Sequence, residues 1–236
     1  MDHADVMPAQ SGIRLFPLFK GRHDVPWWSL VLCGLFLLPG CTALVHKGTP
    51  VNTIVIEPVA GAAEAKPAAF RLIGRASVTG GKDSFSGGVQ WHHTDTGDEI
   101  LLLSPLGQAV AQIQRNREGV YLTTSEQETF YADDVETLTE RVLGWRLPLM
   151  GLQYWVRSVN SPATVSEVDM DIDGTVVAIR QDGWEISYLG YFPMLATQTM
   201  QTKTTQTQPA HPKLLMLKRP GLQIKLVIDN WNAGNH

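Results

Sequence analysis

"GTVVAIRQDGWEISYLGY" (residues 174–191) consists of two strand-length segments joined by Asp182-Gly183. In the second segment Trp184, Ile186 and Tyr188 alternate with polar residues, and a period of two places them on one face of a strand. Asp and Gly both tolerate the backbone conformations of a tight turn. Because so short a connection joins antiparallel neighbours, the stretch predicts a β-hairpin with one apolar face.

The same pattern continues on both sides of this hairpin. Further segments with the length and composition of strands lie at residues 70–78, 85–93, 98–104, 108–114, 119–124, 213–218 and 222–229. Turn formers such as Gly80-Gly81 and Pro220-Gly221 separate them. The sequence therefore predicts a mainly β fold, in which a single curved antiparallel sheet of about ten strands forms an incomplete, open β-barrel.

One helical region interrupts the strands. Residues 133–144 place apolar side chains at helical spacing after two aspartates and end at a glycine, and residues 148–156 predict a second short helix with a large apolar content. We expect the two helices to lie over one opening of the sheet. Two short helices cannot cover the whole apolar face, so the pattern indicates an apolar cavity beneath them.

Apolar side chains on the predicted inner face and on the second helix are the candidates to line this cavity. They are Leu101, Leu103, Leu152, Trp155, Trp184, Ile186 and Tyr188. Aliphatic and aromatic walls of this kind suit acyl chains. Ordinary core packing is the alternative for each residue, because any barrel needs apolar alternation.

The amino-terminal segment has the features of a secretion signal. An apolar run of twelve residues, 27–38, follows Arg14, Lys20 and Arg22, and it is shorter than the roughly 20 residues that a membrane-spanning helix needs. Leu38-Pro39-Gly40-Cys41 resembles the lipobox of bacterial lipoproteins, although Pro39 departs from the usual small residue. The alternative is an ordinary signal peptide followed by a free thiol.

Three segments follow from this assignment. Residues 1–40 are a predicted signal peptide, residues 41–69 a lipidated cysteine and flexible tether rich in Ala, Gly and Pro, and residues 70–236 the folded domain. Within the tether, residues 51–56 form one short β-like run. Acyl chains on Cys41 would anchor the protein stably. By resemblance to enterobacterial lipoproteins, the absence of an aspartate after Cys41 indicates the outer membrane, with the domain on its periplasmic face.

Composition and motifs argue against several other functions. The net charge of −4 gives no basic face for nucleic acid, and no nucleophile or metal-hydrolase motif occurs, so an enzyme is not predicted. His92-His93 lacks further ligands at metal spacing. Residues 169–174 imitate the start of a calcium loop, but Arg180 stands where the bidentate Glu belongs. We predict no cofactor and no metal.

Several motifs together carry a family resemblance. They are the lipobox, LIGR (72–75), LLLSPLGQ (101–108), YADDVETL (131–138), LGWRLPLMGLQYWVRS (143–158), GWEISYLGY (183–191) and IKLVIDNW (224–231). In their order and register they resemble the LolB family of outer-membrane lipoproteins. The resemblance implies an open β-barrel with an apolar cavity under a helical lid, and a protein that accepts lipoproteins from a periplasmic, LolA-like carrier and inserts them into the outer membrane.

The resemblance also assigns roles to a loop and to one arginine. In Pro105-Leu106-Gly107 a large apolar residue occupies a predicted hairpin tip, and the family implies that Leu106 protrudes and enters the membrane. The alternative is that Leu106 folds back under the turn. Arg75 is implied to face the cavity near the lid, with a solvated surface position as the alternative.

The expected partners are the carrier, acylated lipoprotein cargo and outer-membrane lipid, and the expected state is a monomer. Two other functions remain open on the residues alone. A lipocalin-like lipoprotein would hold a small apolar ligand without protein cargo. A structural envelope lipoprotein would have a fully packed interior.

Overall fold

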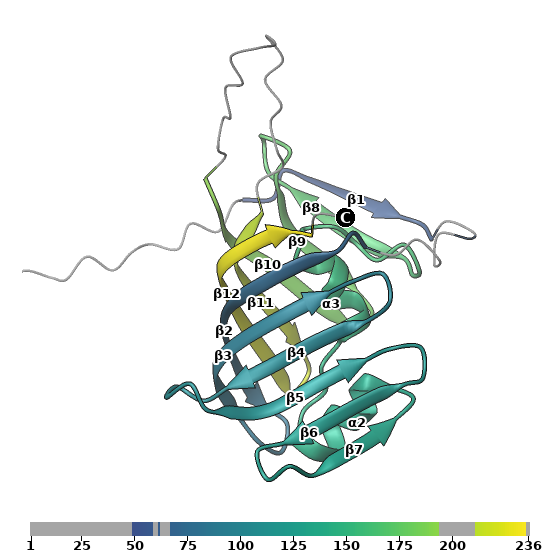
Figure 1. Cartoon of the computed structure of the whole chain (residues 1–236). Helices are drawn as coiled ribbons and strands as arrows, with labels where there is room; N and C mark the ends of the chain where they lie inside the picture. The colour runs from purple at the N-terminus through teal and green to yellow at the C-terminus, as the bar shows by residue number, and fades with distance from the viewer. Residues whose placement is uncertain (1–48, 59–60, 62–66, 194–210, 235–236) are drawn as a thin grey trace, which may run out of the picture. The chain divides into compact units, whose positions relative to one another are not determined.

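The computed structural model describes residues 49–58, 61, 67–193 and 211–234. They form twelve strands and two helices (Figure 1). The elements are β1 (Asn52–Ile56), β2 (Phe70–Gly80), β3 (Phe85–His93), β4 (Asp98–Leu103), β5 (Ala109–Arg115), β6 (Val120–Thr124), β7 (Thr129–Ala132), α2 (Val135–Leu143), α3 (Leu149–Trp155), β8 (Ser166–Met170), β9 (Val176–Gln181), β10 (Trp184–Tyr191), β11 (Pro212–Arg219) and β12 (Leu222–Ala233). The predicted signal peptide and Cys41 lie outside the described residues.

All twelve strands belong to one antiparallel sheet in the order β1-β8-β9-β10-β11-β12-β2-β3-β4-β5-β6-β7. Pairing of β12 with β2 joins the two halves of the chain, with Leu226 opposite Ala76. The sheet curves so that β10 and β11 pass behind β2 to β4, while α2 and α3 lie on its concave side (Figure 1). Because β1 and β7 do not pair with each other, the barrel is open, and the predicted fold class is confirmed.

Apolar alternation builds the inner face. In β10 the side chains of Trp184, Ile186 and Tyr188 are buried, and Leu217 on β11 lies opposite Ile186. The hairpin predicted at residues 174–191 is therefore present, and its second strand has the expected phase. Each buried aliphatic or aromatic side chain of this kind stabilises the fold by about 1.5–3 kcal/mol relative to exposure.

The first helix, α2, begins after Asp134 and ends at Gly144, as the acidic pair and the glycine in the sequence predict. The side chain of Asp134 accepts a hydrogen bond from the backbone N–H of Thr137 at 2.7 Å, and Gly144 adopts a φ of 79° as it ends the helix. The second helix starts after Pro148 and buries Leu149, Leu152 and Trp155. Neither helix of the described part is long and apolar enough to cross a membrane.

Three strands are additional to those predicted: β1, β7 and β8. β1 falls within residues 41–69, where we expected a flexible tether, and pairs with β8 so that Val55 lies opposite Glu167. The tether expectation is therefore wrong for residues 52–56. The side chains of this edge strand are mostly exposed, so no apolar alternation marks it, although its Thr, Ile and Val residues favour strands.

Candidate functional site

An apolar cavity lies between the concave face of the sheet and the lid, which we define as α2, α3 and the connecting residues 144–148. Its volume is about 40 Å³. Lid residues Trp145, Leu147 and Leu152 face apolar side chains of the sheet. The sheet residues that line it are Leu72, Ala76, Val78, Phe85, Val89, Trp91, Ile100, Leu102, Ile224 and Leu226. Ligand pockets usually measure about 300–1,000 Å³, so this conformation is closed.

The predicted cavity residues separate into three groups. Leu152 lines the cavity. Trp155, Trp184, Ile186 and Tyr188 are buried on the inner side of the molecule but pack beside the cavity, with the rings of Trp155 and Trp184 6.5 Å apart. The remaining two, Leu101 and Leu103, do not reach it.

The assignment of Leu101 and Leu103 to the cavity wall is corrected by the register of β4. Leu101 lies between Gln90 of β3 and Gln112 of β5 and faces outward. Ile100 and Leu102 face inward instead, with exposed fractions of 3% and 4%. The run of four apolar residues at 100–103 has no alternation of its own, so its phase could be read only from the neighbouring strands.

A buried carboxylate connects the lid to the sheet. Oδ2 of Asp98 accepts hydrogen bonds from Nε2 of Gln153 on α3 at 2.8 Å and from Nε of Arg115 on β5 at 2.7 Å. Oδ1 accepts one from Nε1 of Trp91 at 2.8 Å and lies 2.7 Å from Nδ1 of His93. Burial opposes the ionisation of Asp98, but the hydrogen bond to His93 and the charge of Arg115 outweigh it and lower the pKa of Asp98 below its ordinary value.

Buried hydrogen bonds to Gln181 and Tyr188 hold the carboxyl end of α3. Nε1 of Trp155 donates to Oε1 of Gln181 at 3.0 Å, and Nε2 of Gln181 donates to the carbonyl of Ser161 at 2.8 Å. The hydroxyl of Tyr188 donates to the carbonyl of Trp155 at 2.8 Å. These bonds make Trp155 and Tyr188 part of the support of α3, and each joins residues too distant in sequence for local patterns to reveal.

The connecting residues 144–148 are held differently from α3. Trp145 and Leu147 place apolar side chains over the cavity, and the ring of Phe85 lies 6.5 Å from that of Trp145. The backbone of this segment bonds to Lys82, Thr139 and Glu140 and to the first turn of α3, and the exposed side chain of Arg146 donates to Glu140 at 2.7 Å. Sequence patterns placed this segment between the two helices but gave no sign that it covers the cavity.

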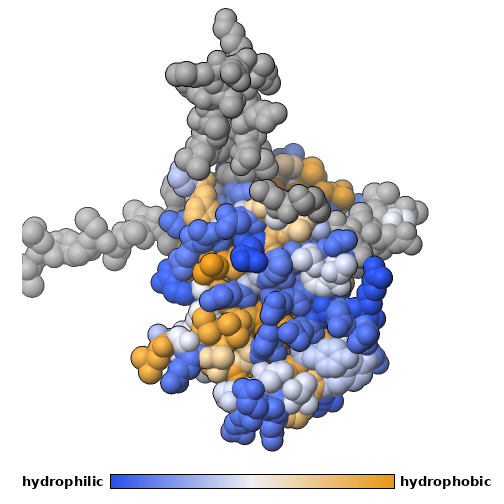
Figure 2. Space-filling model, viewed as in Figure 1, coloured by the Kyte–Doolittle hydropathy of each residue, from blue (hydrophilic) through white to orange (hydrophobic). Residues whose placement is uncertain are grey.

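The loop between β4 and β5 forms a tight turn with an apolar tip. The backbone N–H of Gly107 donates to the carbonyl of Ser104 at 2.8 Å, and Gly107 has a φ of 80°, a region that favours glycine. Leu106 is 88% exposed. The alternative in which Leu106 folds back under the turn is therefore excluded by its position. Figure 2 shows an apolar projection where this hairpin leaves the sheet.

Arg75 does not face the cavity, so its expected contact with the lid is wrong. Its side chain is 67% exposed on the outer face and forms two hydrogen bonds with Asp229, at 3.1 and 3.0 Å. The inward positions of β2 are those of Leu72, Ala76 and Val78. Because Arg75 is an odd-numbered residue of the same strand, the alternation of these residues assigns it to the outer face.

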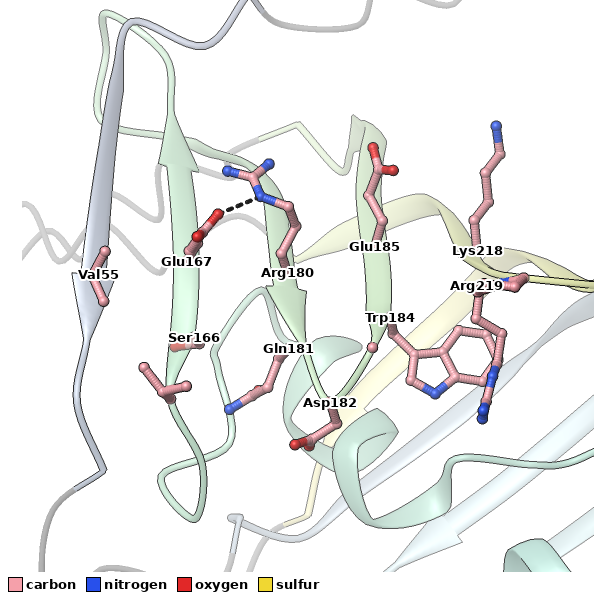
Figure 3. Close-up of a pocket in the computed structure, with 13 residues that line it drawn as sticks. Val55, Ser166, Glu167, Arg180, Gln181, Asp182, Trp184, Glu185, Lys218 and Arg219 are labelled. Carbon is pink, nitrogen blue, oxygen red and sulfur yellow. Dashed lines mark hydrogen bonds and ion pairs between the residues drawn. The ribbon is translucent and has the colours of Figure 1, made fainter.

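A surface groove of about 620 Å³ lies on the outer face of β8 to β11 (Figure 3). Cross-strand neighbours there alternate in charge: Arg180 lies between Glu167 and Glu185, and Lys218 lies beside Glu185. Arg180 donates to Glu167 at 2.7 Å, and its hydrogen bonds to Asp169 and Glu167 raise its pKa. A polar ladder of this kind is unsuited to acyl chains.

The calcium-like stretch is a turn. Oδ1 of Asp171 accepts hydrogen bonds from the backbone N–H groups of Asp173 and Thr175, at 3.0 and 2.8 Å. Asp169 pairs with Arg180. In the described part of the chain no three His, Cys, Asp or Glu side chains are placed to hold a metal ion.

An open antiparallel half-barrel with an apolar concave face, a helical lid and an exposed apolar loop defines a class of proteins that shelter apolar chains. The family model "Outer membrane lipoprotein LolB" matches residues 68–231. The chain belongs to the LolB family.

Two relatives named LolB agree with this assignment. The outer-membrane lipoprotein LolB of Nitrosomonas europaea is 44% identical over 206 residues, covering 87% of this chain and 92% of that protein. LolB of Thiobacillus denitrificans is 39% identical over 165 residues, covering 70% and 81%. A solved domain of a putative outer-membrane lipoprotein-sorting protein from Vibrio parahaemolyticus aligns with a TM-score of 0.41 and 7% identity, over 72% of this chain and 87% of that one.

Proposed function

We propose that this protein is an outer-membrane lipoprotein that accepts acylated lipoproteins from a periplasmic, LolA-like carrier and inserts them into the outer membrane. The observation that carries the proposal is the apolar cavity beneath the lid, lined by aliphatic and aromatic side chains from four strands and from residues 144–152. Membership of the LolB family supports it.

The driving force is partitioning. An acyl chain of about sixteen carbons costs on the order of 10 kcal/mol to expose to water, at ~0.8 kcal/mol per methylene. Cargo must therefore pass from one apolar shelter to another. The concave face offers such a shelter between the carrier and the bilayer, and transfer runs toward the environment that holds the chains best. No catalytic step is part of this proposal.

Acceptance of cargo requires the lid to open, because a cavity of about 40 Å³ cannot hold an acyl chain. Buried polar bonds hold α3 at Gln153 and Trp155. Residues 144–148 cover the cavity mainly with Trp145 and Leu147. We infer that this connecting segment moves first and that α3 stays in place as the fixed side of the opening.

Two further parts complete the proposal. Cys41, acylated as the first residue of the mature chain, anchors the protein to the periplasmic face of the outer membrane, where it works as a monomer. Leu106 enters the bilayer during release of cargo, since an exposed leucine at a hairpin tip gains free energy when it is buried in lipid.

The decisive experiment is transfer in vitro. A radiolabelled acylated lipoprotein bound to its carrier is mixed with vesicles that contain or lack this protein, and labelled cargo is measured in the vesicle fraction. We expect transfer only with the protein present. Absence of transfer, with the protein shown to be folded, would contradict the proposal.

The aliphatic and aromatic lining of the cavity also fits one second candidate, a lipocalin-like lipoprotein that binds a small apolar ligand. This protein would bind a hydrophobic fluorescent probe but would not take cargo from the carrier. Probe binding combined with failure in the transfer assay would support that candidate.

A further inference from the structure

A second groove lies on the outer face of the sheet, at the base of the β4–β5 hairpin. Its volume is about 560 Å³. Its lining includes Arg75, Ser77, Ser86 and Lys225 from the sheet and Ser104 and Pro105 from the hairpin. The groove therefore shares the hairpin with Leu106 but lies on the opposite face of the sheet from the lid cavity.

Strand register arranges the groove in two rows. In the first, Lys225 of β12, Ser77 of β2 and Ser86 of β3 are successive cross-strand partners. The Cβ atoms of such partners are about 4.5–5.5 Å apart, so the side chains of one lysine and two serines leave the sheet side by side on its outer face. In the second row, Arg75 is the partner of Gly88.

Lys225 is the uncompensated charge of the groove. The guanidinium of Arg75 is held by both carboxylate oxygens of Asp229, which balances its charge. Lys225 is exposed, and in the described part of the chain it has no ion-pair partner. A single ammonium beside hydroxyl donors suits a phosphate group.

The floor of the groove is open because two glycines occupy β3. A Cβ atom at Gly88 would lie 3.3 Å from the Cβ of Leu103, so a larger residue would fill the space beside that side chain. A Cβ atom at Gly87 would lie 1.9 Å from the carbonyl oxygen of Leu103. These strands can therefore approach closely only with glycine at position 87.

The hairpin sets the depth at which this groove would meet a membrane. Ser104, Pro105 and Gly107 line it, and Leu106 between them is 88% exposed. In Figure 2 the apolar projection of the hairpin stands out from a surface that mixes polar and apolar residues. If the tip enters the acyl region, its base lies at the level of the headgroups, as for other interfacial anchors.

We propose that this groove binds the phosphate of a phospholipid headgroup, with Lys225 as the charged ligand and Ser77 and Ser86 as hydroxyl donors, while Leu106 is inserted. The inference rests on the proposed function, because it assumes that Leu106 enters the bilayer. It adds a lipid site that orients the protein on the membrane surface and stabilises the inserted state of the loop.

Transfer of labelled lipoprotein from the carrier to vesicles tests this site. The full acylated chain is reconstituted in vesicles of phosphatidylcholine and phosphatidylglycerol. Lys225→Gln should slow release of cargo into lipid about five-fold, the effect of one basic residue near an anionic surface, and leave acceptance from the carrier unchanged. The difference should shrink at 0.5 M salt, because screening is then strong.

Lys218→Gln is the matched control, since Lys218 is an exposed lysine on the neighbouring strand β11 that lines the groove of Figure 3 instead. It should transfer cargo at the normal rate. Equal rates for the two variants would overturn the headgroup site, and so would poor acceptance by Lys225→Gln, which would make Lys225 a carrier contact. Failure of the unsubstituted protein to transfer cargo would instead contradict the proposed function.

A direct binding measurement separates headgroup from free anion. Monomeric dihexanoyl phosphatidylglycerol, titrated into the full chain, should shift the amide resonances of Ser77 and Ser86, and Lys225→Gln should remove most of that shift. Inorganic phosphate at the same concentration should shift them less. Equal shifts by both ligands, or none by the lipid, would overturn the assignment to a phospholipid.

Discussion

The side chain of Gln153 on α3 donates a 2.8 Å hydrogen bond to Asp98 on β4, across 55 residues of sequence. Asp98 has no exposed side-chain surface, and the same carboxylate accepts bonds from Trp91 on β3 and Arg115 on β5. One buried carboxylate thus fixes the lid helix to three neighbouring strands. A charge at this position is tolerated because its partners replace the lost hydration.

Replacement of Gln153 by Leu tests this connection. The variant should lose about 1–3 kcal/mol of unfolding free energy, because buried Asp98 then lacks one donor. A less firmly held α3 should also let a hydrophobic fluorescent probe enter the cavity faster. Urea denaturation and probe association rates measure the two effects. The control is Gln112→Leu, which removes an exposed hydrogen bond to Glu99, and identical behaviour of the two variants would show that Gln153 does not hold the lid.

The lowered pKa of Asp98 predicts a dependence of stability on pH. In the unfolded chain Asp titrates near 3.9, and in the folded protein its pKa is lower, so the unfolded state binds the proton first as the pH falls. The stabilisation by Asp98 should be complete above about pH 4 and be lost as the pH falls through the folded-state pKa. Asp98→Asn should remove the contribution of this carboxyl group to the change of unfolding free energy with pH. We would compare unfolding free energies of both proteins from pH 6 to pH 2, and equal slopes would refute the prediction.

Local sequence signals were sufficient for much of the fold. Alternation at Trp184, Ile186 and Tyr188 predicted β10 and its buried face, and the acidic cap and the glycine at position 144 predicted the ends of α2. These features depend on neighbours in sequence. β1 was marked only as a short β-like run within the tether, because an edge strand with exposed side chains lacks the apolar alternation that assigns a strand to the sheet.

The candidate site was less predictable than the fold. The phase of the apolar run at Leu101 and Leu103 is fixed by pairing with β3 and β5, and the outward direction of Arg75 is fixed by pairing with β12. The role of Asp98 depends on a helix residue 55 positions away. Long-range register and burial decide these points. The turn sequence alone also left the direction of Leu106 open, and only the family resemblance implied that it protrudes.

Trp145→Ala tests whether residues 144–148 cover the cavity. Removing a large buried side chain should lower the unfolding free energy by about 3–5 kcal/mol and enlarge the space beneath the lid. The variant should bind a hydrophobic probe more tightly and more rapidly than the unsubstituted protein, as measured by fluorescence titration. Trp145→Phe, which keeps an aromatic cover, is the control for the loss of stability. Unchanged probe binding in the alanine variant would place the opening elsewhere.

Cys41→Ala tests the proposed anchor. Without acylation the protein should be recovered in the soluble periplasmic fraction or with its signal segment uncleaved, because one apolar run of twelve residues is too short to span the bilayer. The circular dichroism spectrum should keep its β-sheet character, since the described strands and helices lie within residues 52–233. Mass spectrometry of the unsubstituted, membrane-extracted protein should find acyl groups on Cys41. An unmodified chain with a different first residue would contradict the anchor.

Leu106→Glu separates insertion from acceptance of cargo. A charge at the hairpin tip opposes entry into lipid by roughly 2.5–3.5 kcal/mol at full depth, while the cavity, on the other face of the sheet, is unchanged. The variant should take a lipoprotein from the carrier at the normal rate but release it to vesicles at least ten-fold more slowly, so a loaded intermediate should accumulate and be recoverable by co-purification. Ile172→Glu is the matched control, because Ile172 is an 83% exposed apolar residue in the turn between β8 and β9. Poor loading of Leu106→Glu, or normal release, would show that the loop has no membrane role.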